Sequence, residues 1–235
     1  MISYADLRKK PKDFLALTGL ARREFDELLP AFEQVLPAPR KRRRRRQRAE
    51  GGGRKPALPS AADKLFFILV YVKSYPLQTI QAQLFGMSQP SANRYIRQLL
   101  PVLAQGLDAL GVMPERKGPL AAAHERQQRE PKDLIIDGVE RRRQRPKQRE
   151  TQAIHYSGKK KTHSDKNIVV VNTQTKRVSF LSRTLPGSVH DKKLADHARI
   201  SYRSGTTLRS DLGLLGYAPT VREHLQPKKS RRAGN

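Results

Sequence analysis

The sequence predicts an α+β protein, in which a helical N-terminal half is followed by a half built on a β-sheet. Between residues 13 and 110, apolar residues recur at three- and four-residue spacing, which is the period of an amphipathic helix. From Leu134 onward, short apolar runs rich in Ile and Val end at Gly, Asn or charged residues, as buried strands do. The 235 residues suffice for one medium domain or two small ones.

The charge balance indicates a polyanionic partner. The chain has 48 Lys and Arg against 21 Asp and Glu, a formal net charge of +27. So large an excess repels itself unless a polyanion is nearby, which makes nucleic acid the leading partner. Membrane association is not expected, because no apolar run approaches the ~20 residues of a spanning helix and the N-terminus lacks the pattern of a signal peptide. The absence of cysteine excludes disulfides and thiolate metal sites and leaves the cytoplasm as the expected compartment.

Residues 1–36 are expected to form an N-terminal helical segment. The stretch from Asp13 to Leu36 is mainly helical in pattern, with boundaries at Thr18, Gly19 and Pro37. Pro30 is expected to kink or split the second part of this segment. Its role is interpreted as packing against neighbouring helices, with no chemistry of its own.

Residues 37–59 are predicted to be a disordered basic linker. The segment contains a dense arginine block at 40–48 and three glycines at 51–53, with too few apolar residues for a core. Backbone phosphates are the natural partner of such a block, so Arg42, Arg44 and Arg46 are candidate DNA contacts. A solvated loop is the alternative interpretation.

Residues 60–116 have the pattern of a helix-turn-helix domain. A helix that is apolar nearly all round, at 65–72, is expected to be buried in a small bundle. A short helix at 77–84 then leads to a turn, in which Gly86 can adopt a left-handed conformation and Ser88 can cap the next helix. Short helix, glycine turn and capped helix are typical of a helix-turn-helix.

The second helix of this motif carries the candidate base and phosphate contacts. Polar side chains near its start and on its outer face could reach into a major groove, namely Gln89, Ser91, Asn93, Arg94 and Arg97. Two packed helices with a hydrated polar face remain the alternative. Residues 117–130 are polar and lack an apolar stripe, so they are predicted to be a second linker.

The segment 131–235 is predicted to hold a catalytic constellation. Two strand-like runs each end in an aspartate followed closely by a glycine, at Asp137 and at Asp211. Two such strands can bring two carboxylates together at one edge of a sheet. Carboxylate oxygens suit Mg²⁺ or Mn²⁺, and two such ions about 4 Å apart support in-line attack on a phosphodiester. A turn-forming or capping role is the alternative for each aspartate.

Other polar residues of this segment are weaker candidates. Asp191 is expected in the first turn of a helix capped by Ser188, where the helix dipole accounts for it. His155 and His163 lack the spacing of a zinc site. The run Lys159, Lys160 and Lys161 is a candidate for holding a DNA strand near the metals, with a solvated loop as the alternative. No nucleotide-binding glycine motif is present.

Several ordered blocks together resemble the bacterial insertion-sequence transposases of the group named after insertion sequence five, within the DDE superfamily. The blocks cover roughly half the chain, and the helical stretch upstream resembles the N-terminal half of the family. They are Asp137-Gly138, Arg145-Pro146, residues 156–163, residues 186–191, Asp211-Leu212-Gly213, Gly216-Tyr217 and residues 226–229.

The resemblance implies an RNase H-like catalytic domain in which Asp137 and Asp211 are the first two of three catalytic, metal-binding acids. His190 and Asp191 would lie next to these acids and hold them in position without binding the metal themselves. It further implies binding to double-stranded DNA at terminal inverted repeats and target sites, with metal-dependent cleavage and strand transfer. A homo-oligomer would be needed to join two ends, no nucleotide cofactor is required, and the protein would associate with the bacterial nucleoid.

The third acid of the family pattern has no match. It would be a Glu on a helix after the block at 226–229, whereas the last acid of the chain is Glu223, before that block. The chain is therefore expected to be truncated, with an incomplete RNase H-like domain at 131–235. The alternative function is a non-catalytic DNA-binding fragment that represses transposition. An RNA-binding protein would explain the charge but not the paired aspartates.

Overall fold

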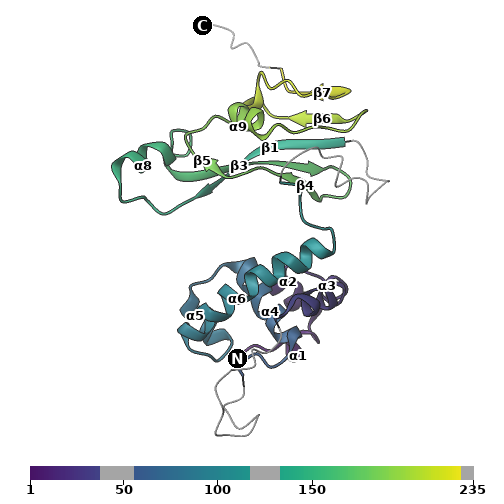
Figure 1. The fold of residues 1–235 in the computed structure, drawn as a ribbon, viewed down its shortest axis with the longest axis vertical. Helices are drawn as coiled ribbons and strands as arrows, with labels where there is room; N and C mark the ends of the chain where they lie inside the picture. The colour runs from purple at the N-terminus through teal and green to yellow at the C-terminus, as the bar shows by residue number, and fades with distance from the viewer. Residues whose placement is uncertain (38–55, 117–132, 229–235) are drawn as a thin grey trace. The chain divides into compact units, whose positions relative to one another are not determined.

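The computed structural model describes residues 1–37, 56–116 and 133–228. It divides into two compact units, Met1–Met113 and Pro114–Asn235, and each is described by itself (Figure 1). The first is helical and the second is built on a mixed sheet, so the predicted α+β fold class is confirmed. The arginine block with Arg42, Arg44 and Arg46, and the expected linker at 117–130, lie outside the described residues. No described helix has the length and apolarity needed to cross a bilayer.

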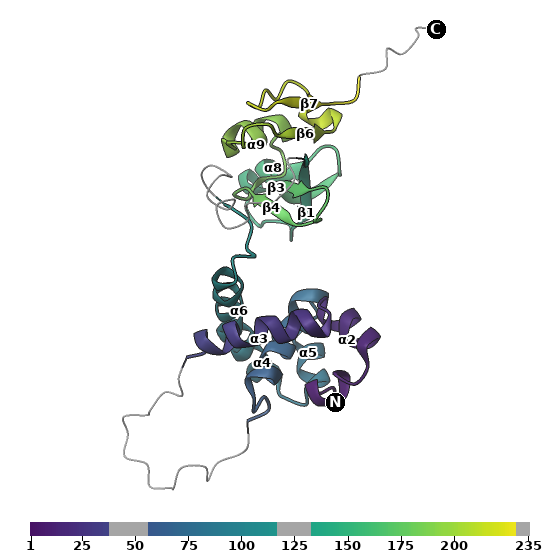
Figure 2. The ribbon, with the colours of Figure 1, turned by 90° about the vertical axis from the view of Figure 1, so that its right-hand side faces the viewer.

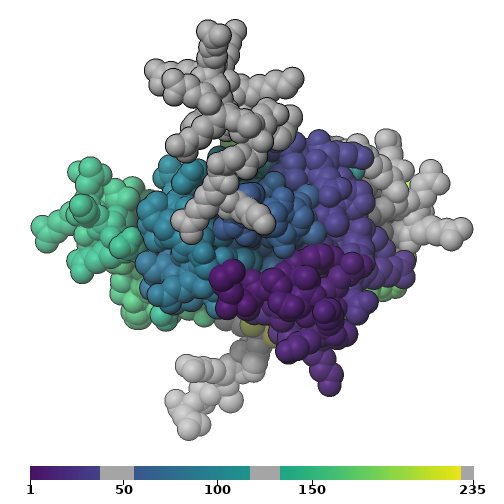
Figure 3. Space-filling model, turned by 90° about the horizontal axis from the view of Figure 1, so that it is seen from below, coloured from purple at the N-terminus to yellow at the C-terminus, as the bar shows by residue number. Residues whose placement is uncertain are grey.

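The N-terminal unit is a helical bundle around one aromatic-rich core. In α4, seven consecutive residues from Leu65 to Tyr71 are buried, as its continuous apolarity predicts. The N-terminal helices pack on it through Phe14, Phe25 and Phe32, and their surface continues directly into that of the later helices (Figure 3). The helices are α1 (Tyr4–Leu7), α2 (Pro11–Thr18), α3 (Arg22–Val35), α4 (Ala61–Ser74), α5 (Gln78–Leu84) and α6 (Gln89–Ala109).

The two internal prolines do not break their helices. Gly19, at φ 75°, ends α2 as expected, but α3 continues through Pro30 instead of splitting there. Pro30 is exposed, so the carbonyl that loses its helical partner is on the solvent side, while Phe25, Leu28 and Phe32 hold both halves to the core. In the same way α6 passes through the exposed Pro101.

The C-terminal unit is a sheet with the strand arrangement of an RNase H-like fold. β1 pairs antiparallel with β3 on one side and parallel with β6 on the other, and β7 extends the sheet parallel to β6 (Figure 2). β2, β4 and β5 all pair with β3. The strands are β1 (Asp133–Arg142), β2 (Tyr156–Ser157), β3 (Thr162–Asn172), β4 (Val178–Leu181), β5 (Leu185–Pro186), β6 (Thr207–Ser210) and β7 (Glu223–Leu225).

One face of this sheet is covered by the helix α9 (Asp191–Ala198), as Figure 1 shows. Leu134 and Ile136 of β1 are buried on that face with Leu194 of α9. Side chains alternate between the two faces of a strand, and Ile135 is accordingly 43% exposed on the other face. Asp137 therefore belongs to the open face, whereas its neighbour Gly138 lies beneath α9. The remaining elements are α8 (Arg149–His155) and a short 3₁₀ turn, η1 (Leu212–Leu214).

Candidate active site and DNA-binding surface

The register of two parallel strands brings the two aspartates together. Ile136 of β1 lies beside Ser210 of β6, so the next residue on each strand, Asp137 and Asp211, follows at neighbouring positions. Adjacent strands are about 4.8 Å apart, which makes these two backbone positions direct neighbours. Both side chains are exposed where β6 ends and β1 continues. The structure thus places two carboxylates at one edge of the sheet.

Each of these carboxylates is held by a backbone amide. Asp137 Oδ1 accepts a hydrogen bond from the N–H of Gly138 at 2.7 Å, and Asp211 Oδ1 accepts one from the N–H of Gly213 at 3.0 Å. Asp211 is thereby the N-cap of η1. Within the described residues the second oxygen of each carboxylate has no hydrogen-bond partner. Capping and metal binding are therefore compatible, because they use different oxygens of one side chain.

Helix α9 begins differently from the prediction. Its N-cap is His190, whose Nδ1 accepts a hydrogen bond from the N–H of Lys192 at 3.4 Å, and not Ser188. Ser188 lies instead in a turn closed by a bond from the N–H of Val189 to the carbonyl of Pro186 at 3.1 Å. Because the turn uses these residues, the helix starts later and Asp191 is its first residue. His190 therefore fixes the start of α9.

Asp191 packs against the glycines that follow both aspartates. A Cβ atom on Gly138 would lie only 2.8 Å from Asp191 Cγ, so no side chain could be accommodated there without a shift. A Cβ atom on Gly213 would lie 3.2 Å from Asp191 Oδ2 and 3.1 Å from Asp211 Oδ1. The carboxylates of Asp191 and Asp211 thus both contact the Cα region of Gly213. The two glycines allow α9 to approach the acid-bearing strands closely.

A buried lysine holds Asp191 in this position. Lys166 Nζ lies 3.2 Å from Asp191 Oδ1 and also donates to the carbonyl of Val189 at 3.1 Å. The side chains of Lys166 and Asp191 are 9% and 18% exposed. A buried ammonium group is tolerated only when it is paired and hydrogen-bonded. The pair therefore ties β3 to the start of α9, a stronger constraint on Asp191 than the helix dipole alone.

Glu140 extends this polar cluster on the same face of β1. It lies opposite Lys166 in the strand register and accepts a hydrogen bond from Ser164 Oγ at 2.5 Å. Burial by itself would raise the pKa of Glu140, but hydrogen bonds from Ser164 and Ser157 and the charges of Lys166 and Lys160 outweigh it and lower the pKa. Glu140, Ser164 and Lys166 were not predicted from the sequence. Lys166 begins a predicted apolar run, but Glu140 and Ser164 lie outside the predicted strands, which β1 and β3 exceed in length.

Glu223 lies at the wrong end of the sheet to join the two aspartates. It begins β7 and pairs with Thr207, the first residue of β6. Asp211 follows the last residue of β6, four positions further, which corresponds to about 13 Å along a strand. The position of Glu223 agrees with its omission from the predicted acids.

The described residues supply part of a metal site. No three His, Cys, Asp or Glu side chains among them lie close enough to hold an ion together. Asp137 and Asp211 nonetheless are candidates for two ligands of a divalent cation, because their backbone positions are neighbours and each carboxylate has an oxygen without a hydrogen-bond partner among the described residues. His155 is paired with Asp165 at 2.9 Å, and the ring of His163 packs edge-on against Tyr156.

The lysine run lies away from the aspartates. Lys159, Lys160 and Lys161 form the exposed turn between β2 and β3, before Thr162. Asp137 is opposite Val169, seven residues along β3 from Thr162, which is about 23 Å in an extended strand. A DNA contact made by these lysines would therefore lie some distance along the sheet from the two acids.

The helix-turn-helix pattern forms as predicted, but its polar side chains are not all free. Gly86 takes the left-handed conformation, with φ 63°. Ser88 is the N-cap residue of α6, yet its hydroxyl bonds to that of Ser91 at 3.0 Å and not to the helix backbone. Gln78 Oε1 accepts hydrogen bonds from Gln89 at 2.8 Å and from Asn93 at 2.9 Å. These two amides brace α5 against α6.

Among the polar side chains of α6 that were predicted to contact DNA, the arginines are more accessible than Gln89 and Asn93. Arg94 and Arg97 are exposed, and neither makes an ion pair within the described residues. Arg94 also lines a polar hollow of about 770 Å³ beside the turn, together with Ser88, Ser91, Tyr95 and Gln98. A cationic helix face next to a polar hollow can bind a phosphate backbone.

Two family models match the chain, one over the helix-turn-helix and one over the sheet that carries the aspartates. Residues 56–108 match a family model described as the helix-turn-helix of DDE superfamily endonuclease. Residues 136–214, which include Asp137, Asp191 and Asp211, match a model described as DDE superfamily endonuclease. None of the curated proteins and none of the solved structures matches the chain significantly.

The lowered pKa of Glu140 predicts a pH-dependent contribution to stability. A carboxyl whose pKa is depressed by folding stabilises the folded state above its unfolded value of about 4.3, and this contribution is lost as the pH falls through the folded pKa. We expect Glu140→Gln to lower the free energy of unfolding at pH 7 and to have a shrinking effect toward pH 3, measured by urea denaturation. Glu150→Gln, at an exposed position on α8, is the control. An equal effect of Glu140→Gln at both pH values would contradict the assignment.

Proposed function

Because the chain carries the helix-turn-helix and the endonuclease domain of the DDE superfamily, we propose that it is a DNA transposase of an insertion sequence. It would bind terminal inverted repeats and carry out metal-dependent cleavage and strand transfer. The observation that supports this proposal most directly is the juxtaposition of Asp137 and Asp211 on adjacent parallel strands. DDE superfamily endonucleases use divalent metals, and these two residues are our proposed ligands for Mg²⁺ or Mn²⁺.

The two units would have separate roles in DNA recognition and catalysis. Residues 60–116 would recognise duplex DNA through α6, and residues 131–235 would perform the chemistry. The α6 residues proposed to contact DNA are Arg94 and Arg97, with Gln89, Ser91 and Asn93 at the turn. Joining two transposon ends requires at least two copies of the chain, and phosphodiester exchange draws no energy from a nucleotide cofactor.

In the proposed mechanism, the chain provides ligands, orientation and charge compensation. Bound divalent cations lower the pKa of the attacking hydroxyl or water and stabilise the leaving oxygen of the phosphodiester. Asp137 and Asp211 would present their remaining oxygens to such ions. The hydrogen bonds that they accept from the backbone N–H groups of Gly138 and Gly213 orient the carboxylates. Both must be ionised to act as ligands.

Asp191 is proposed as a positioning residue. The family resemblance calls for a third carboxylate, and Glu223 lies too far from the other two to provide it. Asp191 is near Asp211, but its Oδ1 is engaged by Lys166. We therefore assign Asp191 and Lys166 the task of holding α9 against Gly138 and Gly213, which fixes the backbone around both ligands.

A non-catalytic DNA-binding protein that represses transposition is the second candidate. The favouring observation is that no three potential ligands cluster within the described residues. Such a protein would retain the exposed arginines of α6 and would bind DNA equally well with and without a chelator.

Asp137→Asn and Asp211→Asn are expected to abolish cleavage while leaving duplex binding intact. Each removes one anionic ligand, and a loss of at least about 100-fold is expected, because changes to groups that merely support a ligand already cost about 10–100-fold. The assay is nicking of an inverted-repeat duplex with Mg²⁺ or Mn²⁺. Glu223→Gln, which removes a carboxylate of β7 beside the first residue of β6, should cleave normally. Full nicking by both Asp variants would refute the catalytic assignment, and unchanged DNA binding with no nicking by any form would favour the repressor.

Asp191→Asn is expected to weaken metal use without unfolding the sheet. The substitution removes the charge that pairs with Lys166 but keeps the size of the side chain. We expect the metal concentration for half-maximal cleavage to rise about tenfold, the lower end of the range for supporting groups. Asp196→Asn, an exposed acid on the same helix, should leave it unchanged. An effect of Asp191→Asn on thermal stability alone, with an unaltered metal titration, would reduce the role to packing.

Arg94→Ala and Arg97→Ala are expected to reduce duplex affinity and its salt dependence. Each phosphate contact contributes close to one unit to the slope of log affinity against log salt, so each substitution should lower the slope by about one. Arg22→Ala, an exposed arginine on α3, is the matched control. Fluorescence anisotropy over a range of salt concentrations measures the slopes, and equal slopes for all three variants would argue against contact through α6.

A further inference from the structure

Asp211 lies just beyond the paired part of the sheet. β6 makes its last pair with β1 at Ser210 and its last pair with β7 at Arg209. The backbone of Asp211 therefore lies past the paired residues on both sides. One local contact is a long hydrogen bond of 3.4 Å from the N–H of Leu214 to the Asp211 carbonyl. A metal ligand in such a place needs further groups that fix its backbone.

The side chain of Gln226 holds the carbonyl of Asp211. Gln226 directly follows β7, and its Nε2 donates to the Asp211 carbonyl at 2.8 Å and to Ser210 Oγ at 3.3 Å. A carbonyl oxygen can only accept a hydrogen bond, so the nitrogen end of the amide must face Asp211. Pro227 disfavours a helical conformation of Gln226, which favours an extended continuation of β7. One side chain thus joins the two strands where their backbone pairing has stopped.

Ser210 links this amide to His224 on β7. His224 and Gln226 are two positions apart on an extended chain, so their side chains point to the same face. Ser210 Oγ lies 2.8 Å from His224 Nε2. The hydroxyl accepts from Gln226, and the described residues offer its proton no other acceptor than this ring nitrogen. The imidazole must therefore be unprotonated at Nε2, and burial favours this neutral form because it lowers the pKa of His224.

The hydrophobic core of this unit anchors the other end of the network. The ring of Tyr217 lies edge-on to that of His224, with the ring centroids 6.3 Å apart. Tyr217 is only 9% exposed and belongs to the core that also contains Leu194 of α9. Its hydroxyl oxygen lies 3.2 Å from that of Tyr202. A chain of contacts thus runs from the core through His224 to the backbone of Asp211.

We propose that Gln226 is a positioning residue for Asp211. Ser210 and His224 hold its amide in place. The inference rests on the proposed function for the role of Asp211 as a metal ligand, and it gives a role to the first residue of the block at 226–229. By fixing the carbonyl of Asp211, the amide fixes the direction in which the carboxylate leaves the backbone. The carboxylate is then oriented before a cation binds, so binding requires less ordering.

The first test measures the Mn²⁺ affinity of the full chain without DNA, by electron paramagnetic resonance of the free ion. Gln226→Met keeps the length of the side chain but removes the donor. We expect about tenfold weaker Mn²⁺ binding, the lower end of the range for groups that orient a ligand. Gln144→Met, at an exposed position shortly after β1, is the control and should bind Mn²⁺ as the wild type does. Adding Gln226→Met to Asp211→Asn should cost no further affinity, because the amide acts through Asp211, and additive losses would contradict the proposal.

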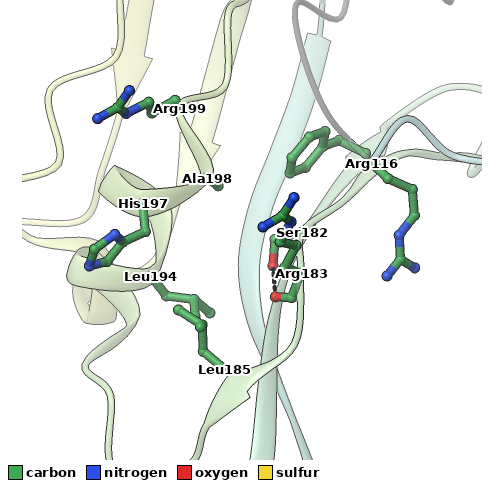
Figure 4. A pocket seen from close by; sticks show the side chains of 9 residues that line it. Arg116, Ser182, Arg183, Leu185, Leu194, His197, Ala198 and Arg199 are labelled. Carbon is green, nitrogen blue, oxygen red and sulfur yellow. Dashed lines mark hydrogen bonds between the residues drawn. The ribbon is translucent and has the colours of Figure 1, made fainter.

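Ser182 provides a control that separates metal binding from stability. Ser182 and Ser210 are 4% and 8% exposed, and each directly follows a strand. The Ser182 hydroxyl donates to the carbonyl of Arg183 at 2.8 Å, marked by the dashed line in Figure 4, and accepts from the N–H of Ile168 at 2.8 Å. Neither contact reaches β6 or β7. Ser182→Ala and Ser210→Ala should both lower the free energy of unfolding, but only Ser210→Ala should weaken Mn²⁺ binding. Equal Mn²⁺ affinities of the two variants would reduce the network to packing and overturn the proposal.

A second measurement does not depend on metal binding. Amide hydrogen exchange at Gly213 reports on the bond from its N–H to Asp211 Oδ1. Gln226→Met should speed this exchange several-fold, whereas Gln144→Met should not. Unchanged exchange at Gly213 would overturn the role of Gln226 whether or not the chain binds Mn²⁺. A wild-type chain that neither binds Mn²⁺ nor nicks DNA, but in which Gln226→Met speeds the exchange, would overturn the proposed function alone.

Discussion

The ion pair between Lys166 and Asp191 is the constraint on which the positions of Asp137 and Asp211 depend. The end of the sheet that carries these two aspartates is called the acidic edge below. A lysine and an aspartate that are 9% and 18% exposed need each other, because either one alone would be a poorly solvated charge. Their contact fixes the start of α9 above β1 and β3. Since Asp191 then lies against Gly138 and Gly213, the identity of both glycines and the local path of both acid-bearing strands follow from one pair of charges.

The exposed carboxylates of Asp137 and Asp211 are the second feature of this edge. Two carboxylates that approach each other repel, and a cation bound between them compensates for that repulsion. Each is held by a backbone amide through one oxygen, so the second oxygen is left without a partner among the described residues. A protein that merely needed turns at these positions could use one uncharged capping residue. Each aspartate therefore combines a contact to a backbone amide with an oxygen that can still bind a ligand, which is what the proposed metal site requires.

The local pattern of the sequence predicts most of the fold and little of the support around the acids. Runs such as Leu134–Ile136 identify strands, because periodicity is a property of consecutive residues, but they do not give the strand ends. The first strand is predicted to end at Asp137, whereas β1 continues to Arg142 because it stays paired with β3. The pairing of Lys166 with Asp191 joins residues from β3 and α9, and no periodicity connects them. Local pattern likewise predicts Ser188 as the cap of α9, because the turn before the helix cannot be recognised from the sequence. Serine is the commoner cap, and only the turn from Pro186 to Val189 shows that the helix starts at Asp191.

Helix α9 connects the two regions of opposite charge in this unit. Asp191 is at its N-terminal end, where the helix dipole favours an anion, and His197 and Arg199 are at its C-terminal end, where it favours cations. The same eight-residue helix therefore packs against the strands that carry Asp137 and Asp211 at one end and carries basic side chains at the other. The helix dipole thus matches the charges of the side chains at both ends of α9.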